Sequence, residues 1–173
     1  MSAEQIRDAI RDIPDFPKPG IIFKDITPIL KDPALFKATN DILAEQVKVA
    51  GATKLAAIDA RGFLFAGALA ERLDIGIVPI RKQGKLPYKT FEETYDLEYG
   101  SATLAVHQDA FEAGERVVIV DDLLATGGTA QATAKLVEQC GATVAAILFV
   151  VELAFLNGRE KLAGYTVFAP VVY

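Results

Sequence analysis

Short apolar runs alternate with stretches of helical spacing along most of the chain. The runs at 54–59, 75–80 and 116–120 predict strands, because each is short and borders a segment whose apolar residues are spaced differently. Residues 63–73 and 129–140 space their apolar side chains as helices do, and Gly141 fits the C-terminal cap of the second helix. This alternation predicts an α/β fold with a central parallel sheet flanked by helices.

Two further apolar segments predict the last strands of that sheet. Residues 143–153 (TVAAILFVVEL) are too apolar for an edge and predict one buried strand. Residues 166–172 (TVFAPVV) predict a final strand, in which Pro170 marks an edge or a bulge because proline has no N–H to donate.

Two segments interrupt this rhythm and predict additions outside the sheet. Residues 13–31 hold four prolines around a short extended core and predict a small N-terminal hood. Residues 82–109 alternate polar and aromatic side chains, which favours a two-stranded flexible flap over a crossover helix. The remaining pattern is continuous, so residues 1–173 are expected to form a single domain with these two additions.

Charge and composition narrow the classes of function. The formal net charge of −5 argues against an extended nucleic-acid surface, which would have to be basic, but leaves room for a small anionic ligand. No apolar run is long enough for a membrane span, and the polar N-terminus predicts no secretory signal. Cys140, the only cysteine, cannot form an internal disulfide and fits a reducing, cytoplasmic setting. His107, the only histidine, is read as a solvated strand residue, so a histidine triad or zinc site is not expected.

The segment RVVIVDDLLATGGTA at 116–130 predicts an anion site. A strand that enters a glycine-rich turn and then a helix points backbone N–H groups at a ligand. Thr126 and Thr129 add hydroxyl donors, and either is suited to cap the helix. The alternative is an ordinary tight strand-to-helix turn. The G-x-x-x-x-G-K-[ST] and G-x-G-x-x-G spacings are absent, which disfavours nucleoside triphosphatases and nicotinamide dehydrogenases.

Two adjacent carboxylates, Asp121 and Asp122, stand before this turn. They would repel a phosphate beside them, but they accept hydrogen bonds strongly from hydroxyl groups. They also suit indirect binding of Mg²⁺, since magnesium keeps several waters and takes few protein ligands. A ribose 5-phosphate, with a phosphate at one end and vicinal hydroxyls nearby, matches the whole segment.

The same segment resembles the phosphoribosyl-pyrophosphate (PRPP) motif of the type I phosphoribosyltransferases. Further segments resemble the adenine phosphoribosyltransferase branch of that family in the same order along the chain: PDFPKPGIIFKDITPIL, DARGFLFAGALA, IRKQGKLPY, LEYG and VELAFLNGREKL. The resemblance covers nearly the whole chain. It implies the type I phosphoribosyltransferase fold and transfer of a phosphoribosyl group from PRPP to adenine, which yields AMP and pyrophosphate.

The resemblance also implies a role for each polar segment. Asp121 and Asp122 would hold the ribose hydroxyls, with Mg²⁺ bound mainly by PRPP and water rather than directly by the protein. The 5′-phosphate would lie on the turn formed by Ala125, Thr126, Gly127, Gly128 and Thr129. Arg61 would hold the pyrophosphate, next to a cis peptide expected between Asp59 and Ala60. Arg81, Lys82 and Lys85 would form a second cationic group, part of it reaching the partner's site in a homodimer; the alternative for these three is a solvated loop.

Adenine recognition is expected around residues 21–24. An extended backbone presents an N–H and a C=O that match the acceptor and donor on the edge of adenine, and a mispaired buried edge costs roughly 1–3 kcal/mol per group. The resemblance assigns this role to the backbone of Ile22 and Lys24, with Phe23 stacked on the base and Leu153 opposite. Without the resemblance, Phe23 is read as an ordinary core residue.

In the flap, the resemblance makes Glu98 the catalytic carboxylate, which handles the proton of the purine ring, with Tyr99 beside it. A solvated hairpin glutamate is the alternative for Glu98. Two other functions remain open at this point: transfer to another purine such as xanthine or guanine, and a PRPP-sensing regulator without catalysis. The second is disfavoured because the chain has no room for a DNA-binding domain and its net charge is negative.

Overall fold

The computed structural model describes residues 1–173. Contacts between residues group the chain into two compact units, Met1–Ile42 and Leu43–Tyr173, and each is described by itself below. The single-domain organisation stays a prediction. None of the helices has the length and apolar character needed to cross a membrane.

The first unit begins with helix α1 (Ala3–Ala9), which Ser2 and Gln5 close with a capping box. Strands β1 (Arg11–Pro14) and β2 (Ile22–Asp25) then form an antiparallel hairpin, and helix α2 (Thr27–Lys31) follows. The proline-rich segment therefore does hold a short extended core. Helix α3 (Pro33–Ala50) starts here and continues into the second unit.

No helix was predicted for residues 33–50, although the chain carries the signal for one. Leu43, Ala44 and Val47 are buried at helical spacing in the part of α3 that belongs to the second unit.

The second unit is built on a seven-stranded sheet in the order β11-β9-β7-β3-β4-β6-β5. Its strands are β3 (Lys54–Ile58), β4 (Gly76–Lys82), β5 (Thr90–Asp96), β6 (Ser101–His107), β7 (Arg116–Val120), β9 (Thr143–Leu148) and β11 (Val167–Phe168). All pair in parallel except β5 and β6. The strands predicted at 54–59, 75–80 and 116–120 are confirmed within two residues at each end.

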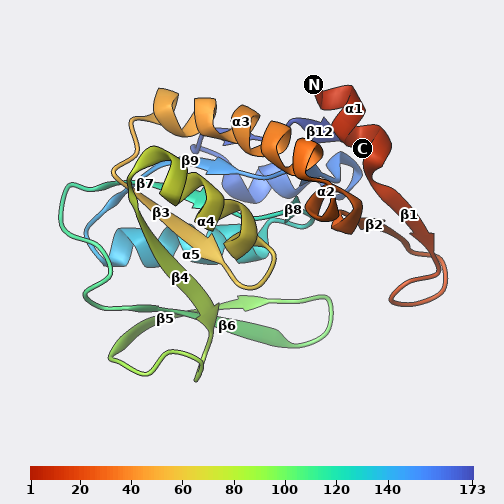
Figure 1. Ribbon diagram of the computed structural model, residues 1–173. Helices are drawn as coiled ribbons and strands as arrows, with labels where there is room; N and C mark the ends of the chain where they lie inside the picture. The colour runs from red at the N-terminus through yellow and green to blue at the C-terminus, as the bar shows by residue number, and fades with distance from the viewer. The chain divides into compact units, whose positions relative to one another are not determined.

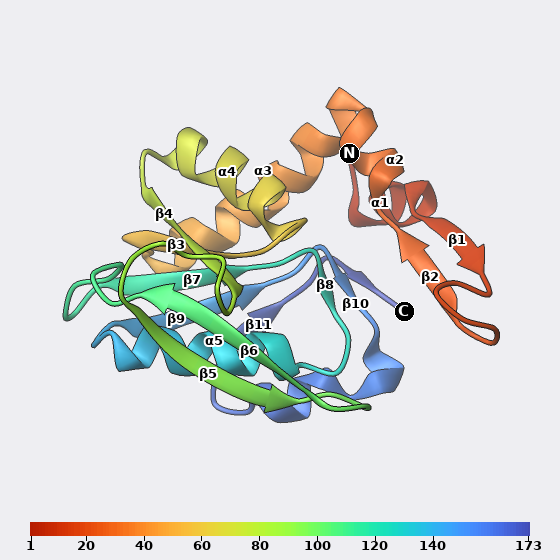
Figure 2. The same ribbon diagram turned by 90° about the horizontal axis from the view of Figure 1, so that it is seen from below.

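Helices α4 (Gly62–Leu73) and α5 (Gly128–Gln139) cover opposite faces of this sheet (Figures 1 and 2). The connection from β3 to β4 moves along the sheet in one direction, and that from β7 to β9 moves in the other. Right-handed crossovers in opposite directions place their helices on opposite faces. Both helices confirm the sequence prediction within one residue, and Gly141 has the left-handed φ of +86° that suits a helix end.

Three strands of the sheet break at the same level and continue into a small parallel sheet. After two residues β7 resumes as β8 (Leu123–Leu124), β9 as β10 (Val151–Glu152) and β11 as β12 (Val171–Val172). The single strands predicted at 143–153 and 166–172 are therefore wrong in extent. In the first, the N–H groups of Val150 and Val151 both donate to the carbonyl of Asp122, which kinks the chain; in the second, Pro170 lies in the break.

The predicted flap is a hairpin of β5 and β6, but it does not lie outside the sheet. Strand β6 pairs with the end of β4 through Arg81↔Ala105 and Lys82↔Leu104, so the hairpin extends the sheet at one edge. His107 closes β6 half-buried, where its Nε2 accepts a hydrogen bond from the Tyr88 N–H at 3.3 Å.

Candidate active site

The loops that follow β3 and β7 meet where the strand order of the sheet reverses. In open α/β sheets this switch point is a crevice at the carboxyl ends of the strands, where ligands bind. The two loops approach closely, since a Cβ added to Gly62 would lie 2.8 Å from the carbonyl oxygen of Val120. The peptide between Asp59 and Ala60 is cis, as the resemblance implies. Polar residues of both loops therefore share one site.

The acidic pair lies in the break between β7 and β8. Asp122 is buried, and its Oδ2 pairs with Nε of Arg61 at 2.5 Å. Asp121 accepts the N–H of Asp122 on Oδ1 at 2.8 Å. Burial, and then the neighbouring charge of Asp122, raise the pKa of Asp121 well above its ordinary value. The structure thus brings Arg61 and both carboxylates together: Arg61 pairs with Asp122, and its charge also lowers the pKa of Asp121, by less than burial and Asp122 raise it.

The glycine-rich turn joins β8 to α5. Gly127 has a φ of +86°, and a Cβ there would overlap the carbonyl oxygen of Gly158, so only glycine fits without displacement. Gly127 is also the N-cap of α5, and no side chain caps the helix. The expectation that Thr126 or Thr129 caps α5 is wrong, because Gly127 ends the turn and the Thr129 hydroxyl bonds to Tyr95 at 3.0 Å.

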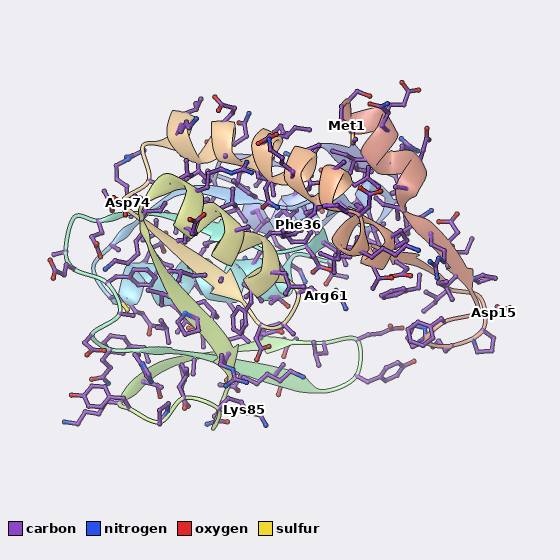
Figure 3. All side chains as sticks on the ribbon, in the orientation of Figure 1. Met1, Asp15, Phe36, Arg61, Asp74 and Lys85 are labelled. Carbon is purple, nitrogen blue, oxygen red and sulfur yellow. The ribbon has the colours of Figure 1, made fainter.

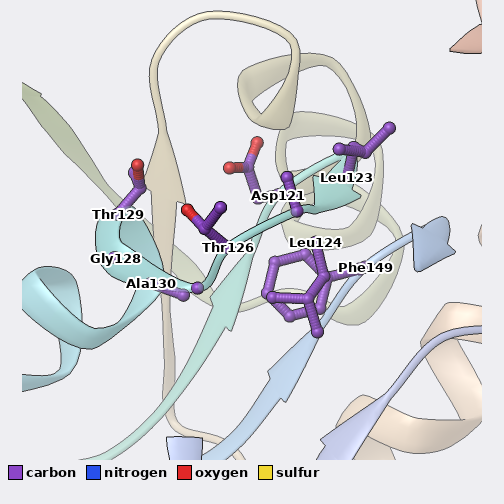
Figure 4. A pocket seen from close by; sticks show the side chains of 10 residues that line it. Asp121, Leu123, Leu124, Thr126, Gly128, Thr129, Ala130 and Phe149 are labelled. Atoms are coloured by element: carbon purple, nitrogen blue, oxygen red, sulfur yellow. The ribbon is translucent and has the colours of Figure 1, made fainter. Parts of the chain in front are cut away.

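A small cavity lies along this turn and includes all five predicted residues, Ala125 to Thr129, together with Asp121. In Figure 4 the oxygens of Asp121, Thr126 and Thr129 point to the same side of the loop, away from the ring of Phe149. Phe149 is buried and lies in the break between β9 and β10. The turn therefore offers hydroxyl groups on one side and rests on the core on the other.

A larger cavity of about 400 Å³ carries the cationic residues. Lys82, Lys85 and Thr129 line it, with Asp59 and Ala60. Figure 3 marks Lys85 in the turn after β4 and Arg61 in the loop after β3.

Arg81 has a different place from the two lysines. Its Nε lies 2.9 Å from Oδ2 of Asp59, and its Nη1 donates to the carbonyl of Lys85 at 3.3 Å. Arg81 therefore ties the β4 turn to the loop after β3 and does not line the cavity.

The predicted flap residues occupy the tip of the β5–β6 hairpin. Leu97 donates its N–H to the carbonyl of Gly100 at 2.9 Å, which closes a four-residue turn around Glu98 and Tyr99. The side chain of Tyr99 is 80% exposed. Neither cavity described above is lined by Glu98 or Tyr99.

The residues expected to read a base fall in both units. In the first, Phe23 lies edge-to-face against Phe16 with the ring centroids 5.2 Å apart, and Lys24 pairs with Asp12 at 2.6 Å. Ile22 starts the strand and is exposed. In the second unit, Leu153 follows β10 and donates its N–H to the carbonyl of Leu124. Phe23 is only half-buried, so it is not an ordinary core residue.

The site contains residues that the sequence analysis did not single out. Glu152 is buried and accepts three hydrogen bonds from Arg159, at 2.7 to 2.9 Å, and Arg159 also donates to the carbonyl of Val167. This pair holds the segment whose Gly158 rests on the glycine-rich turn. Tyr95 was also missed, although the period-2 pattern of β5 predicts that it shares a face with Phe91 and Glu93.

Comparison with known proteins agrees with this geometry. The phosphoribosyl transferase domain family matches residues 25–165. A curated adenine phosphoribosyltransferase of Kosmotoga olearia is 56% identical over 97% of this chain and 99% of its own length. The crystal structure of adenine phosphoribosyltransferase from Thermoanaerobacter pseudethanolicus superposes with a TM-score of 0.96 at 52% identity, covering 99% of this chain and 100% of its own.

A more distant neighbour carries a ligand. The enzyme of Saccharomyces cerevisiae, crystallised with an imino-altritol bisphosphate and adenine, has a TM-score of 0.93 at 41% identity, with 97% of both chains covered. The strand order, the acidic pair and the glycine-rich turn are thus found in a chain that matches such enzymes over its whole length. The chain belongs to the phosphoribosyltransferase family, and within it to the adenine phosphoribosyltransferases.

Proposed function

We propose that the chain transfers the phosphoribosyl group of PRPP to adenine and releases AMP and pyrophosphate. The observation that carries this proposal is the crevice between β3 and β7, where Arg61 and the acidic pair meet the glycine-rich turn. A phosphorylated sugar needs anion donors and hydroxyl acceptors within a few ångströms of each other. The full-length identity to adenine phosphoribosyltransferases supports adenine as the acceptor.

The turn at 125–129 binds the 5′-phosphate of PRPP. Its backbone N–H groups and the positive end of α5 favour a dianion, and Thr126 and Thr129 add hydroxyl donors. Asp121 and Asp122 accept the ribose 2′- and 3′-hydroxyls. The carboxylates therefore face the sugar and not the phosphate, which removes the repulsion that their position suggests.

The leaving pyrophosphate is bound by cations from two loops. Arg61 is half-exposed, and a guanidinium can serve two acceptors at once, so it can bind pyrophosphate while it stays paired with Asp122. Lys82 and Lys85 supply positive charges in the larger cavity, and Arg81 holds their turn in place. Tyr99 at the hairpin tip completes the PRPP contacts.

Magnesium fits this donor set only in part. Two carboxylates are present, but Asp122 already pairs with Arg61, so PRPP oxygens and water must supply most ligands. When bound, Mg²⁺ would neutralise charge on the pyrophosphate, with Asp121 and Asp122 as the nearest carboxylates of the protein. The protein's part is to orient those hydroxyls.

The reaction is a displacement at C1′ that passes through an oxocarbenium-like state and needs no covalent nucleophile. Positioning of the sugar and neutralisation of the leaving group supply most of the catalysis. Glu98 takes the proton of the imidazole ring as N9 attacks, once the hairpin tip closes over the site. Closure also excludes water, which would otherwise hydrolyse the activated sugar.

Adenine is selected by the backbone of β2. Ile22 and Lys24 are two residues apart in a strand, so their N–H and C=O groups point to the same edge. They meet the N1 acceptor and N6 donor of adenine, and a 6-oxopurine presents the opposite pattern. Phe23 stacks on the ring, which contributes about 1–3 kcal/mol.

The proposal includes a cytoplasmic homodimer. Leu64 on α4 and Ile77 on β4 are large apolar side chains that stay 48% and 42% exposed, as expected where a partner covers them. The lone free thiol of Cys140 fits a reducing compartment. Sedimentation at micromolar concentration tests the dimer, and a monomer would contradict this part of the proposal.

A substrate panel tests the function. Purified protein with labelled PRPP and Mg²⁺ is offered adenine, hypoxanthine, guanine and xanthine, and nucleotide and pyrophosphate are measured. AMP formation with adenine, at least tenfold faster than with the 6-oxopurines, is expected from the mispaired-edge penalty. Preference for an oxopurine would identify a different transferase, and PRPP binding without turnover would identify a regulator.

A further inference from the structure

Tyr95 and Thr129 connect the hairpin to the glycine-rich turn. Their hydroxyl oxygens are 3.0 Å apart, and either can be the donor. Tyr95 lies one residue before the end of β5, next to the tip that carries Glu98. Thr129 is the second residue of α5. A side chain of the hairpin therefore touches the turn directly.

The ring of Tyr95 fits this place because Gly128 has no side chain. A Cβ added to Gly128 would lie 3.0 Å from Cδ2 of Tyr95. Farther along α5, Glu93 pairs with Lys135 at 3.4 Å and accepts a hydrogen bond from Gln139 at 3.2 Å. Strand β5 thus lies along α5 over several turns, and Tyr95 marks the end nearest the turn.

Thr129 is shared by the two cavities of the site. It lines the small cavity on the glycine-rich turn and also the larger cavity with Lys82 and Lys85, and Tyr95 lines the larger one too. A threonine hydroxyl has one hydrogen to donate and lone pairs that accept. A phosphate dianion has no hydrogen, so it needs the hydrogen of Thr129. With phosphate bound, Tyr95 must then be the donor to Thr129.

We propose that Tyr95 is a positioning residue for the 5′-phosphate: its hydroxyl donates to Oγ1 of Thr129 and turns the Thr129 hydrogen toward the ligand. This inference rests on the proposed binding of the 5′-phosphate to residues 125–129. Each hydrogen bond of such a chain polarises the next one. The same contact ties the hairpin that bears Glu98 to occupation of the phosphate site.

Tyr95→Phe tests the relay, because it removes the hydroxyl and keeps the ring over Gly128. The Kd of ribose 5-phosphate, measured by calorimetry, and the KM of PRPP are expected to rise about five- to tenfold, as for one lost hydrogen bond. The KM of adenine should change less than about twofold. Tyr165→Phe is the matched control, since its hydroxyl also makes one hydrogen bond, to Glu138 at 2.7 Å, outside the site.

A double-mutant cycle separates positioning from general loosening. If Tyr95 acts through Thr129, adding Tyr95→Phe to Thr129→Val should not weaken ribose 5-phosphate binding further. Amide exchange of the hairpin tip at 97–100 should slow on ribose 5-phosphate binding in the parent and not in Tyr95→Phe. An unchanged Kd in Tyr95→Phe, or additive effects in the cycle, would overturn the inference. Failure of the parent to make AMP would refute the proposed function instead, because binding of ribose 5-phosphate does not depend on turnover.

Discussion

Arg61 and Asp122 form an ion pair across the crevice between β3 and β7. The side chain of Asp122 is only 8% exposed, whereas that of Arg61 is 48% exposed. A buried carboxylate needs a compensating cation, and removal of that cation would leave an unpaired buried charge. Arg61 therefore supports the acidic pair before any ligand binds, and about half of its side chain stays exposed.

Replacing either carboxylate of the acidic pair should weaken the use of PRPP much more than that of adenine. Asp121→Asn and Asp122→Asn each remove a charged hydrogen-bond acceptor. Loss of a hydrogen bond to a charged group costs about 1.5–3 kcal/mol, which corresponds to roughly a 10- to 100-fold loss in kcat/KM for PRPP. Steady-state kinetics with each substrate varied in turn measure the effect. Asp109→Asn, an exposed carboxylate outside the site, is the control. Equal losses for both substrates would contradict the ribose assignment.

Asp121→Asn should stabilise the ligand-free protein. The pKa of Asp121 is raised well above its ordinary value of 3.8, so the unfolded chain releases this proton at a lower pH than the folded chain. Stability is then lost as pH rises between these two pKa values. Asparagine does not titrate and keeps an oxygen for the N–H of Asp122. The melting temperature should exceed that of the parent near neutral pH.

The pH dependence of the increase in melting temperature tests its cause. Below the ordinary pKa, Asp121 is protonated in both states, so the advantage of Asp121→Asn should shrink toward about pH 4. Thermal melts from about pH 4 to pH 8 measure it. A constant difference in melting temperature across that range would show that burial of the charge is not its cause.

Gly127→Ala should destabilise the protein more than Gly84→Ala. Both glycines have nearly the same left-handed φ, +86° and +85°. An alanine in that backbone conformation therefore costs about 1–2 kcal/mol of stability in both variants. Only Gly127 would push its Cβ into the carbonyl of Gly158, whereas Gly84 has no atom within 4 Å. Urea denaturation measures both. Equal costs would mean that the segment carrying Gly158 moves away freely, despite the pairing of Arg159 with Glu152.

Glu98→Ala should lower kcat and leave adenine affinity almost intact. General acid–base help typically contributes about 10²- to 10⁴-fold, and Glu98 meets the base only when the hairpin tip closes. Initial rates at saturating substrates and adenine binding by calorimetry separate the two quantities. Glu160→Ala, an exposed glutamate outside the hairpin, should keep the parent's kcat. A kcat unchanged in Glu98→Ala would remove this residue from the chemistry.

Local sequence determined the elements and the chemistry of the central turn. Apolar runs such as 116–120 specify buried strands, because a strand of a parallel sheet is covered on both faces. The order of two carboxylates, small residues and Thr-Gly-Gly-Thr specifies what a strand-to-helix turn can bind. Both signals depend on residues that are neighbours in the chain, so they can be recognised from the sequence without knowledge of the fold.

Tertiary structure alone decided how distant segments meet. The aligned breaks that place Asp121 and Asp122 at the switch point arise from hydrogen bonds between residues far apart in the chain, such as those from the N–H groups of Val150 and Val151 to the carbonyl of Asp122. The joining of the hairpin to β4, and the contact of Tyr95 with Thr129, likewise link residues far apart in the chain. No local period encodes such pairs, because each depends on burial and geometry supplied by the rest of the sheet.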